Sequence, residues 1–389
     1  MTNSDIIVIG GGITGSALSY ELAKKGLKVL LLEKDAIADN ATQYSYGGLA
    51  YWSGTTELTR QLCQEGINIH RNLSAELDAD TEFREISLIL TIDAGDDPNL
   101  VFQNYGRFAI PPQLLTVEQG CEVEPLLNPK AISGVLKLPH GHINTQKTSK
   151  AYQQGFCRLG GEIKIEQVTK LLREKNRIIG VETPQGSYFA DKVIVAAGGL
   201  SRFLLAEAGI NVRLYFTHAQ LIKTPPIKDI KLRTLIMPAV QKRLIMESNC
   251  TQTEREDLWT NPSSELMEGI IEPGAIQFLD HSFVLGQISQ VRTDYRAAID
   301  PVTSEAEIRT EIGRLLPLLH NIPGTWHSCL VAFANNSRPL VGEINNFSGI
   351  YLFSGFTSPL VFAPPLARHF ASWIGGENDK IIRQLSPVS

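Results

Sequence analysis

The sequence lacks three features that mark particular classes of protein. It has no excess of positive charge, because 36 Lys and Arg stand against 41 Asp and Glu, for a formal net charge of -5. We therefore expect no nucleic-acid partner. Its cysteines are few, odd in number and never paired as C-x-x-C, which is typical of buried thiols in a reducing cytoplasm. An apolar run begins almost at once, so we expect no signal peptide and a cytoplasmic location.

The sequence also has no continuous apolar run of the length that spans a membrane. Its most apolar stretch, residues 349–370, contains three prolines, at 359, 364 and 365. Because proline interrupts helices, we expect buried core there and no transmembrane segment. Peripheral membrane contact stays open. His140 and His142 lie two residues apart in "LPHGHINT", where we expect solvated turn residues and no metal site.

What the sequence does contain, at its N-terminus, is the pattern of a dinucleotide-binding unit. An apolar strand over residues 5–10 precedes a helix predicted over 13–25 and a second strand over 27–34. Glycines between strand and helix allow a tight turn, close approach of a pyrophosphate and tight helix packing. The free N–H groups of the helix N-terminus then face the phosphates. These glycines are Gly10, Gly12 and Gly15.

Glu33 lies at the end of the second strand, where a carboxylate can accept hydrogen bonds from ribose hydroxyls. The same carboxylate would repel a 2′-phosphate, so NADP is disfavoured. A tight turn in an unrelated α/β domain would explain the glycines alone, but not the whole strand–turn–helix–strand–Glu order.

Three later glycine turns favour FAD over NAD. "TQYSYGGLAYW" (42–52) lets backbone lie close to a flat ring, and "VIVAAGGLS" (193–201) is a strand that runs into small residues. In the block 338–367, a strand ends at Gly355 and a helix follows; its N-terminus could stabilise negative charge on a reduced flavin. Each turn could be ordinary packing, but their order and spacing indicate one extended cofactor.

The distribution of strands predicts two domains in an α/β fold. Long apolar strands occur in 1–83, 142–212 and 322–389, which we assign to a discontinuous FAD-binding Rossmann-type domain. Short strands and loops rich in Pro, Gly and charge occur in 84–141 and 213–321, which we assign to an α+β substrate domain with a mixed or antiparallel sheet. Within the second domain, 250–270 is polar and acidic, and we favour a surface excursion there over a lid.

With these motifs the sequence resembles the D-amino-acid oxidase superfamily of flavoproteins, and within it the glycine oxidase and sarcosine oxidase branch. The resemblance covers nearly the whole chain and rests on "VIGGGITG", Glu33, "YSYGGL", Val168 in "IEQVTKL", "VIVAAGGLS", "HAQLIKT" and the C-terminal block. It implies a glutathione-reductase-like FAD domain and non-covalently bound FAD. The positions it assigns to FAD are Gly10, Gly12, Ile13, Thr14, Gly15, Glu33, Lys34, Ser45, Gly47, Gly48, Leu49, Val168, Ala197, Gly198, Gly355, Thr357, Ser358, Pro359 and Leu360.

By this resemblance the protein is an oxidoreductase that removes a hydride from a carbon bearing nitrogen, in a small amine or amino acid, and passes it to flavin N5. Two alternatives stay open: a flavoenzyme acting on a hydroxy acid or a larger biosynthetic intermediate, and an FAD-binding homologue with little activity alone. The sequence does not decide between oxygen, a quinone and a partner protein as electron acceptor. It also leaves a homo-oligomer open.

The sequence departs from the family pattern where the substrate binds. Val331 stands where amino-acid oxidising members have an Arg that clamps the substrate carboxylate. Arg338 is the remaining candidate for anion binding, with a surface salt bridge as the alternative. Gly274 stands where an aromatic hydroxyl is expected, and Phe362 where sarcosine oxidases have a Lys. Cys329 lies near the position of their flavin thioether, and we favour inert packing for it.

Charged residues of the predicted substrate domain are further candidates. Arg292 and Arg296 lie in "QVRTDYRAAID", which we expect to be an exposed segment, so surface or interdomain roles are favoured for them. The full set is Arg243, Glu272, Arg292 and Arg296.

Overall fold

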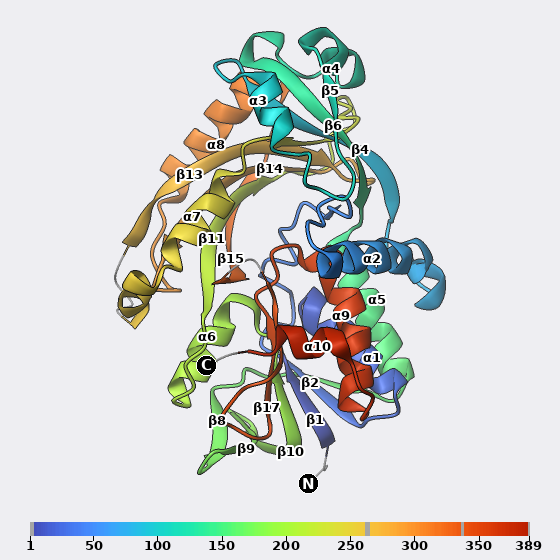
Figure 1. Cartoon of the computed structure of the whole chain (residues 1–389), viewed down its shortest axis with the longest axis vertical. Helices are drawn as coiled ribbons and strands as arrows, with labels where there is room; N and C mark the ends of the chain where they lie inside the picture. Colours follow the sequence, from blue (N-terminus) through green and yellow to red (C-terminus); the bar gives the residue numbers. More distant parts are fainter. Residues whose placement is uncertain (1–3, 261–264, 336–337, 388–389) are drawn as a thin grey trace.

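The computed structural model describes residues 4–260, 265–335 and 338–387. In these ranges the chain forms two sheets with helices packed around them (Figure 1). The α-helices are α1 (Ile13–Lys24), α2 (Glu57–Glu76), α3 (Pro98–Gln103), α4 (Val117–Val123), α5 (Thr145–Arg158), α6 (Ser201–Glu207), α7 (Lys242–Cys250), α8 (Pro301–Leu315), α9 (Pro359–Ile374) and α10 (Lys380–Leu385). Short 3₁₀ turns are η1 (Pro129–Ala131), η2 (Gly198–Leu200), η3 (Thr253–Thr260) and η4 (Pro317–Leu319).

The first sheet is built around parallel strands from the N-terminal, middle and C-terminal parts of the chain. Its strands in spatial order are β16 (Leu340–Glu343), β17 (Ile350–Ser354), β10 (Gly186–Val195), β1 (Ser4–Ile9), β2 (Val29–Glu33) and β7 (Glu162–Ile165), with β9 (Arg177–Thr183) paired to β10 and β8 (Lys170–Glu174) paired to β9. β1 pairs in parallel with β2 and β10. The predicted N-terminal strand–helix–strand unit is therefore present.

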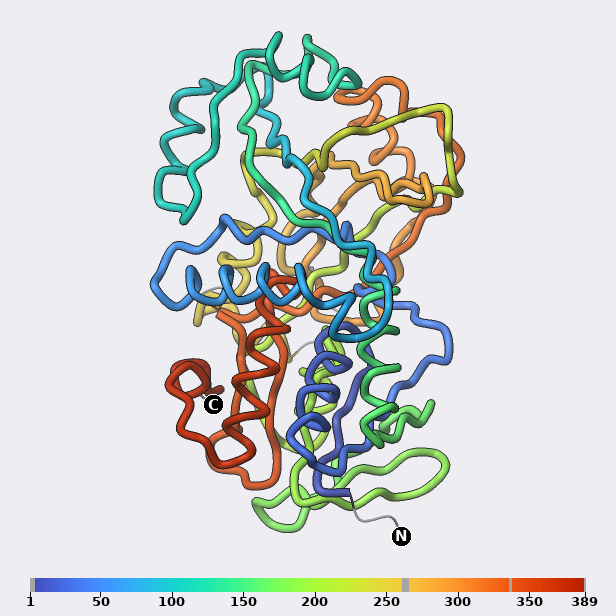
Figure 2. Tube along the Cα trace, turned by 90° about the vertical axis from the view of Figure 1, so that its right-hand side faces the viewer, coloured from blue at the N-terminus to red at the C-terminus, as the bar shows by residue number. Residues whose placement is uncertain are grey.

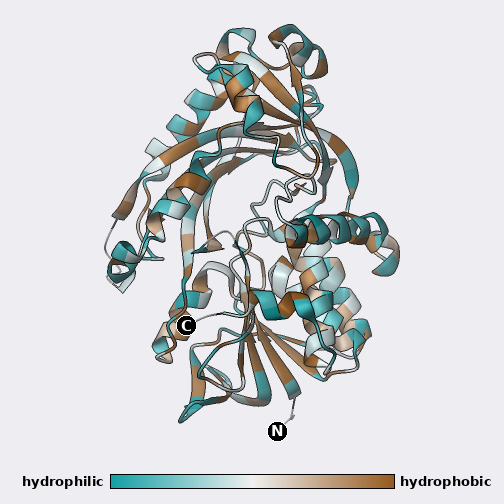
Figure 3. Cartoon of the chain, in the orientation of Figure 1, coloured by the Kyte–Doolittle hydropathy of each residue, from teal (hydrophilic) through white to brown (hydrophobic). Residues whose placement is uncertain are grey.

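The strands of this sheet are apolar because both faces are covered. Ile7 and Val8 of β1 are fully buried on opposite faces. Helices α1, α5 and α9 pack together on one face, where Figure 2 shows the C-terminal helices beside the N-terminal ones. Figure 3 shows hydrophobic residues along these strands and hydrophilic ones on α2.

The second sheet is mixed and curves over the first (Figure 1). Its strands in spatial order are β15 (Thr325–Ala334), β11 (Leu214–Lys223), β14 (Phe283–Arg292), β13 (Glu265–Gln277), β12 (Leu235–Pro238), β4 (Arg84–Asp93), β6 (Ile132–His142) and β3 (Gly48–Leu49), with β5 (Gln113–Leu115) paired to β6. β12 and β4 are parallel, and the other pairs are antiparallel. Helix α8 packs on one face through Ile308 and Ile312.

The division into two domains stays a prediction, but strand pairing differs from the expected boundaries in two places. β15, which we expected within the FAD-binding segment 322–389, pairs along its whole length with β11 of the second sheet. β3, within 1–83, pairs with β6 of the same sheet. Both strands belong by sequence to the predicted FAD-binding segments but are hydrogen-bonded into the second sheet. The residue composition of a strand does not show which sheet it pairs with.

The expectation of solvated turns at His140 and His142 is wrong. Both lie on β6 between β4 and β3, and both are buried. His140 Nδ1 accepts a hydrogen bond from Trp52 Nε1 at 3.1 Å, and His142 Nδ1 accepts one from Arg84 Nε at 3.3 Å. Burial lowers the pKa of each to about 3, so both are neutral near pH 7. Strand pairing on both sides outweighs the turn propensity of the Pro–His–Gly–His sequence.

The segment 250–270 is only partly the surface excursion that we expected. Trp259 on η3 is buried against Tyr215 and Phe216, and β13 begins at residue 265. Residues 261–264 of this expectation lie outside the described residues.

The most apolar stretch forms β17 and α9, and it is buried core as predicted. Within the described ranges, no helix combines the length and apolar character needed to cross a membrane. The described residues also contain no group of three or more His, Cys, Asp and Glu side chains placed to hold a metal ion.

Helix α9 continues through Pro364 and Pro365, and residues of α2 pack against the carbonyl groups that these prolines leave without a helical donor. A proline has no N–H, so the carbonyls of Leu360 and Val361, four residues earlier, lose their helical partners. His70 Nε2 of α2 lies 2.7 Å from the Leu360 oxygen. Gly66 lets α2 approach so closely that a Cβ there would lie 2.0 Å from the Val361 oxygen. The two helices are therefore locked together at the start of α9.

We expect His70→Leu to lower the free energy of unfolding by about 1–3 kcal/mol, because it leaves the buried Leu360 carbonyl without a partner. Burial lowers the pKa of His70 to about 4, so near pH 7 the neutral ring donates this bond through Nε2. Chemical denaturation against Gln64→Ala, an exposed change on the same helix, measures the effect. Equal stability of the two variants would contradict it.

His369 of α9 joins α2 and α10 through ion pairs and predicts a pH dependence of stability. Its Nε2 lies 3.0 Å from Glu65 Oε2 and its Nδ1 lies 2.6 Å from Asp379 Oδ2. Glu65, and then Asp379, raise the pKa of His369 from 6.5 to about 8. Such a shift corresponds to about 2 kcal/mol at most. The stabilisation is complete below the unfolded pKa and is lost as pH rises through the folded pKa.

We therefore expect His369→Gln to be less stable than wild type by about 1–2 kcal/mol near pH 6 and nearly equal to it near pH 9. Denaturation curves at the two pH values measure the difference. A stability difference that does not change with pH would show that the imidazolium is not responsible.

Candidate functional site

One cavity of about 700 Å³ lies between the two sheets. It is bounded by the carboxyl ends of β1, β10 and β17, by the first turns of α1 and α9, and by β15 of the second sheet. Ligands of open α/β sheets bind at such carboxyl ends. The sequence-predicted FAD positions that line this cavity are Gly10, Gly12, Ile13, Thr14, Glu33, Lys34, Ser45, Val168, Ala197, Gly198, Gly355, Pro359 and Leu360.

The turn between β1 and α1 has room for backbone and ligand but not for side chains. Gly10 has a φ of +106°, and a Cβ there would lie 2.6 Å from the carbonyl oxygen of Ala196. A Cβ on Gly15 would lie 1.9 Å from the Gly10 oxygen. Gly12, at the N-cap of α1, has no side chain to cap the helix. The Ile13 N–H is bonded to Thr42 Oγ1, and the other N–H groups of the first turn remain for an anion. This cradle fits the pyrophosphate of a dinucleotide.

Glu33 lies at the end of β2, at the cavity wall. Its Oε2 accepts the Gly11 N–H at 2.5 Å and its Oε1 accepts the Asp35 N–H at 3.0 Å. These bonds hold the carboxylate beside the glycine turn, where it can also accept from ribose hydroxyls. Thr42, which sequence reasoning missed, accepts the N–H of Ile13 at 3.0 Å and so caps α1 from a separate loop.

Several predicted FAD positions lie near the cavity without lining it. Gly15 packs α1 against the turn, and Gly47, with a φ of +72°, lies against the Ile143 carbonyl. Gly48 and Leu49 form β3. Arg338 is exposed and is not among the lining residues. The predicted positions absent from the cavity wall are Gly15, Gly47, Gly48, Leu49, Thr357, Ser358 and Arg338; their roles, like those of the lining residues, stay predictions.

The opposite wall comes from β15, whose residues 328–332 line the cavity and carry no charge. Val331, the position of the expected carboxylate clamp, lies on this wall and pairs with Thr217 of β11. Burial raises the pKa of the Cys329 thiol to about 12. The thiol is therefore protonated near pH 7, and a thiolate is the reactive form.

Sequence reasoning assigned no site role to two further lining residues, His218 and Tyr295, and favoured a surface or interdomain role for a third, Arg296. Burial lowers the pKa of His218 to about 4, and its Nε2 lies 3.0 Å from the Asp294 oxygen. Arg296 is exposed, as expected, but borders the cavity and stacks on Tyr295. Their segments, "HAQLIKT" and "QVRTDYRAAID", are far apart in the sequence, and the pairing of β11 with β14 brings His218 and the loop after β14 to the same cavity.

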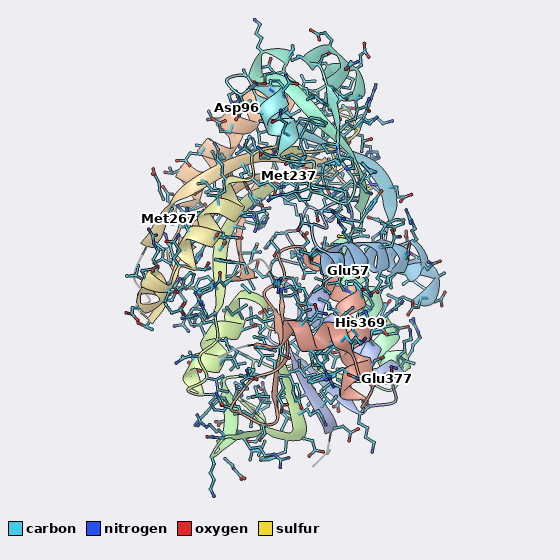
Figure 4. The ribbon with its side chains drawn as sticks, in the orientation of Figure 1. Glu57, Asp96, Met237, Met267, His369 and Glu377 are labelled. Atoms are coloured by element: carbon cyan, nitrogen blue, oxygen red, sulfur yellow. The ribbon has the colours of Figure 1, made fainter. Side chains whose placement is uncertain are left out.

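Two family departures are explained by packing. A Cβ on Gly274 would lie 2.8 Å from the Ile236 oxygen and 3.0 Å from the Met237 sulfur, so a side chain cannot project there without a shift. Met237 is labelled in Figure 4 at the underside of the curved sheet. Phe362 is buried on α9 in the core of the first sheet and does not line the cavity.

Comparisons with known proteins agree with the resemblance. The family model named DAO, FAD dependent oxidoreductase, matches residues 5–373. The chain is 25% identical over 382 residues to 4-methylaminobutanoate oxidase (formaldehyde-forming) of Paenarthrobacter nicotinovorans, covering 96% of this chain and 44% of the relative. It is also 25% identical over 384 residues to human mitochondrial dimethylglycine dehydrogenase, covering 95% and 42%. The chain thus spans less than half the length of these relatives.

Solved structures confirm the predicted fold class. Glycine oxidase from Bacillus cereus superposes with a TM-score of 0.78 at 22% identity, covering 100% of this chain and 99% of that one. L-proline dehydrogenase from P. horikoshii gives a TM-score of 0.77 at 20% identity, covering 99% and 96%.

Gly15→Ala tests the cradle. Because the added Cβ would overlap the Gly10 carbonyl, α1 must move away from β1, at a cost of about 1–3 kcal/mol or more. We expect loss of most bound flavin, measured by visible absorbance per mole of protein, and a lower melting temperature. Gly95→Ala, where no atom lies within 4 Å of the new Cβ, is the control. Normal flavin content in Gly15→Ala would contradict the assignment.

Proposed function

The chain belongs to the DAO family of FAD dependent oxidoreductases, and on that premise we propose that it oxidises the C–N bond of a small amine or amino acid. The observation that carries the proposal is that one cavity joins a dinucleotide cradle to an uncharged wall of the second sheet. The activities of its relatives, 4-methylaminobutanoate oxidase, dimethylglycine dehydrogenase and glycine oxidase, support this reaction class.

The residues present fit FAD. Gly10 and Gly12 would lie against its pyrophosphate and Glu33 against a ribose. The first turn of α9, locked to α2 by His70, would face the pyrimidine edge with the positive end of its helix dipole. When bound, the flavin supplies a hydride acceptor, and the protein supplies binding and orientation.

The cavity wall sets the form in which the substrate binds. Residues 328–332 of β15 are uncharged, and His218 is neutral because burial lowers its pKa to about 4. An uncharged wall disfavours an ammonium group at the reacting nitrogen. The substrate therefore presents a neutral amine, whose nitrogen lone pair can assist hydride loss from the adjacent carbon, and the wall excludes water from that carbon.

Anaerobic titration of the purified yellow protein tests the proposal. We expect an amine or amino acid to bleach the flavin absorbance, with a rate that rises with pH as the free amine fraction increases. The panel contains glycine, sarcosine, proline, D-amino acids, simple amines, diamines and 2-hydroxy acids, with dithionite as the control for reducibility. Reoxidation by air then compares oxygen with a quinone as electron acceptor.

Two outcomes would contradict the proposal. Bleaching by 2-hydroxy acids alone would move the reaction from C–N to C–O bonds. Bleaching by dithionite but by no member of the panel would favour an FAD-binding homologue with little activity alone.

A further inference from the structure

A buried charged cluster lies beside the uncharged wall of the cavity. Thr217, the strand partner of Val331, donates its hydroxyl hydrogen to Glu247 Oε1 at 2.7 Å. Arg243, one turn earlier on α7, donates from Nη1 to the same oxygen at 3.0 Å. The N–H of Arg243 donates to Glu272 Oε1 of β13 at 3.0 Å. Three elements, α7, β11 and β13, thus bring these groups together.

The cluster lies on the face of the second sheet opposite α8. Ile222 and Ile288 pack on α8, and side chains alternate between the faces along a strand. Thr217, five residues before Ile222, therefore points to the other face, as its bond to α7 shows. Glu272 lies on that face too, since it contacts the start of α7. Figure 1 shows α7 and α8 on different sides of the arch.

The charges of this cluster do not balance. Glu247 and Glu272 are 4% and 5% exposed, and Arg243 is the cation of an ion pair with Glu247. In the described part of the chain, Glu272 forms no ion pair within 4 Å; it accepts a backbone N–H instead. Buried charges are normally paired. Burial raises the pKa of Glu272, and Arg243 opposes that shift only in part. A positive group from outside the chain would offset the cost of burying this carboxylate.

Tyr46 supplies a second, independent observation. Its hydroxyl oxygen is buried, and among the described residues it has no hydrogen-bond partner. Glu272 is near enough that its charge, after burial, helps to raise the pKa of Tyr46 above the usual range. Tyr46 directly precedes Gly47 and Gly48, which are predicted to flank the flavin. An unpaired hydroxyl thus lies near Glu272, on the segment that directly precedes Gly47 and Gly48.

Resting on the proposed function, we propose that Glu272 and the Tyr46 hydroxyl bind a second positive group of the substrate, distant from the reacting nitrogen. The substrate class is then a diamine or polyamine rather than an amino acid. An ammonium N–H donates to both oxygens, and the cluster then holds two carboxylates against two cations. A substrate carboxylate would be the third negative group around a single guanidinium, with Val331 in place of a clamp.

A matched series tests this: a four-carbon diamine, the monoamine and the amino acid of the same length. In the wild type we expect the diamine to have the highest kcat/KM for flavin reduction. Glu272→Gln, which keeps an acceptor for the Arg243 N–H, should raise the KM for the diamine at least about tenfold. The KM for the monoamine should hardly change. Glu268→Gln, exposed on the same strand, is the control.

Binding of 2,5-dimethylhexane-2,5-diamine, a four-carbon diamine that has no hydrogen on the carbons bearing nitrogen and so none to transfer, is followed by the flavin spectrum and gives a readout without turnover. We expect it to bind the wild type and Glu268→Gln, and to bind Glu272→Gln at least about tenfold more weakly. Melting temperatures show whether Glu272→Gln is folded. If Glu272→Gln is not folded, Tyr46→Phe replaces it as the test variant, and we expect that variant to bind the ligand severalfold more weakly than the wild type does.

The two proposals fail differently. If no amine bleaches the flavin, the proposed reaction is wrong, and the titration with the unreactive diamine still supports or contradicts the binding site. If the amino acid is preferred and Arg243→Lys raises its KM, the cluster is a carboxylate clamp and the inference is overturned. Equal affinity of wild type and Glu272→Gln for the unreactive diamine also overturns it.

Discussion

The structure depends on one close contact, in which the backbone of β1, the end of β10 and the start of α1 meet without side chains between them. Gly10 lies against the Ala196 carbonyl, and Gly15 lies against the Gly10 carbonyl. Any Cβ at these points would separate helix from sheet. With the contact formed, the N-terminus of α1 is open, Glu33 reaches the Gly11 N–H, and the cofactor half of the cavity takes its shape.

The start of α9, at another edge of the cavity, is held in place by hydrogen bonding and close packing against α2. Two prolines in α9 leave two carbonyls without helical donors. His70 of α2 donates a hydrogen bond to one of them, and Gly66 of α2 lets the helix approach the other closely. The first turn of α9 is thereby held beside the cavity. One wall of the site is thus positioned by glycine contacts, and another by a proline-dependent lock.

The second sheet contributes the wall of the cavity that lies opposite the first sheet. Residues 328–332 of β15 face the cavity without charge, whereas Arg243 and Glu247 lie on α7 and Glu272 lies on β13, three strands away from β15. Oxidation of an amine by hydride transfer needs a neutral nitrogen on the reacting carbon, and a second binding contact elsewhere on the substrate to orient it. The arrangement separates the two tasks in space.

The sequence by itself determined the cofactor half of this protein. The spacing of Gly10, Gly12, Gly15 and Glu33 is local, because the β-α-β unit folds from consecutive residues, and thirteen predicted FAD positions line the cavity. Only the tertiary structure decided the substrate half. His140 and His142 became buried strand residues, β15 joined the second sheet, and Thr217, Arg243, Glu247 and Glu272 met from three elements. Their meeting depends on strand pairing and sheet curvature, which join residues far apart in the chain and leave no local pattern to read.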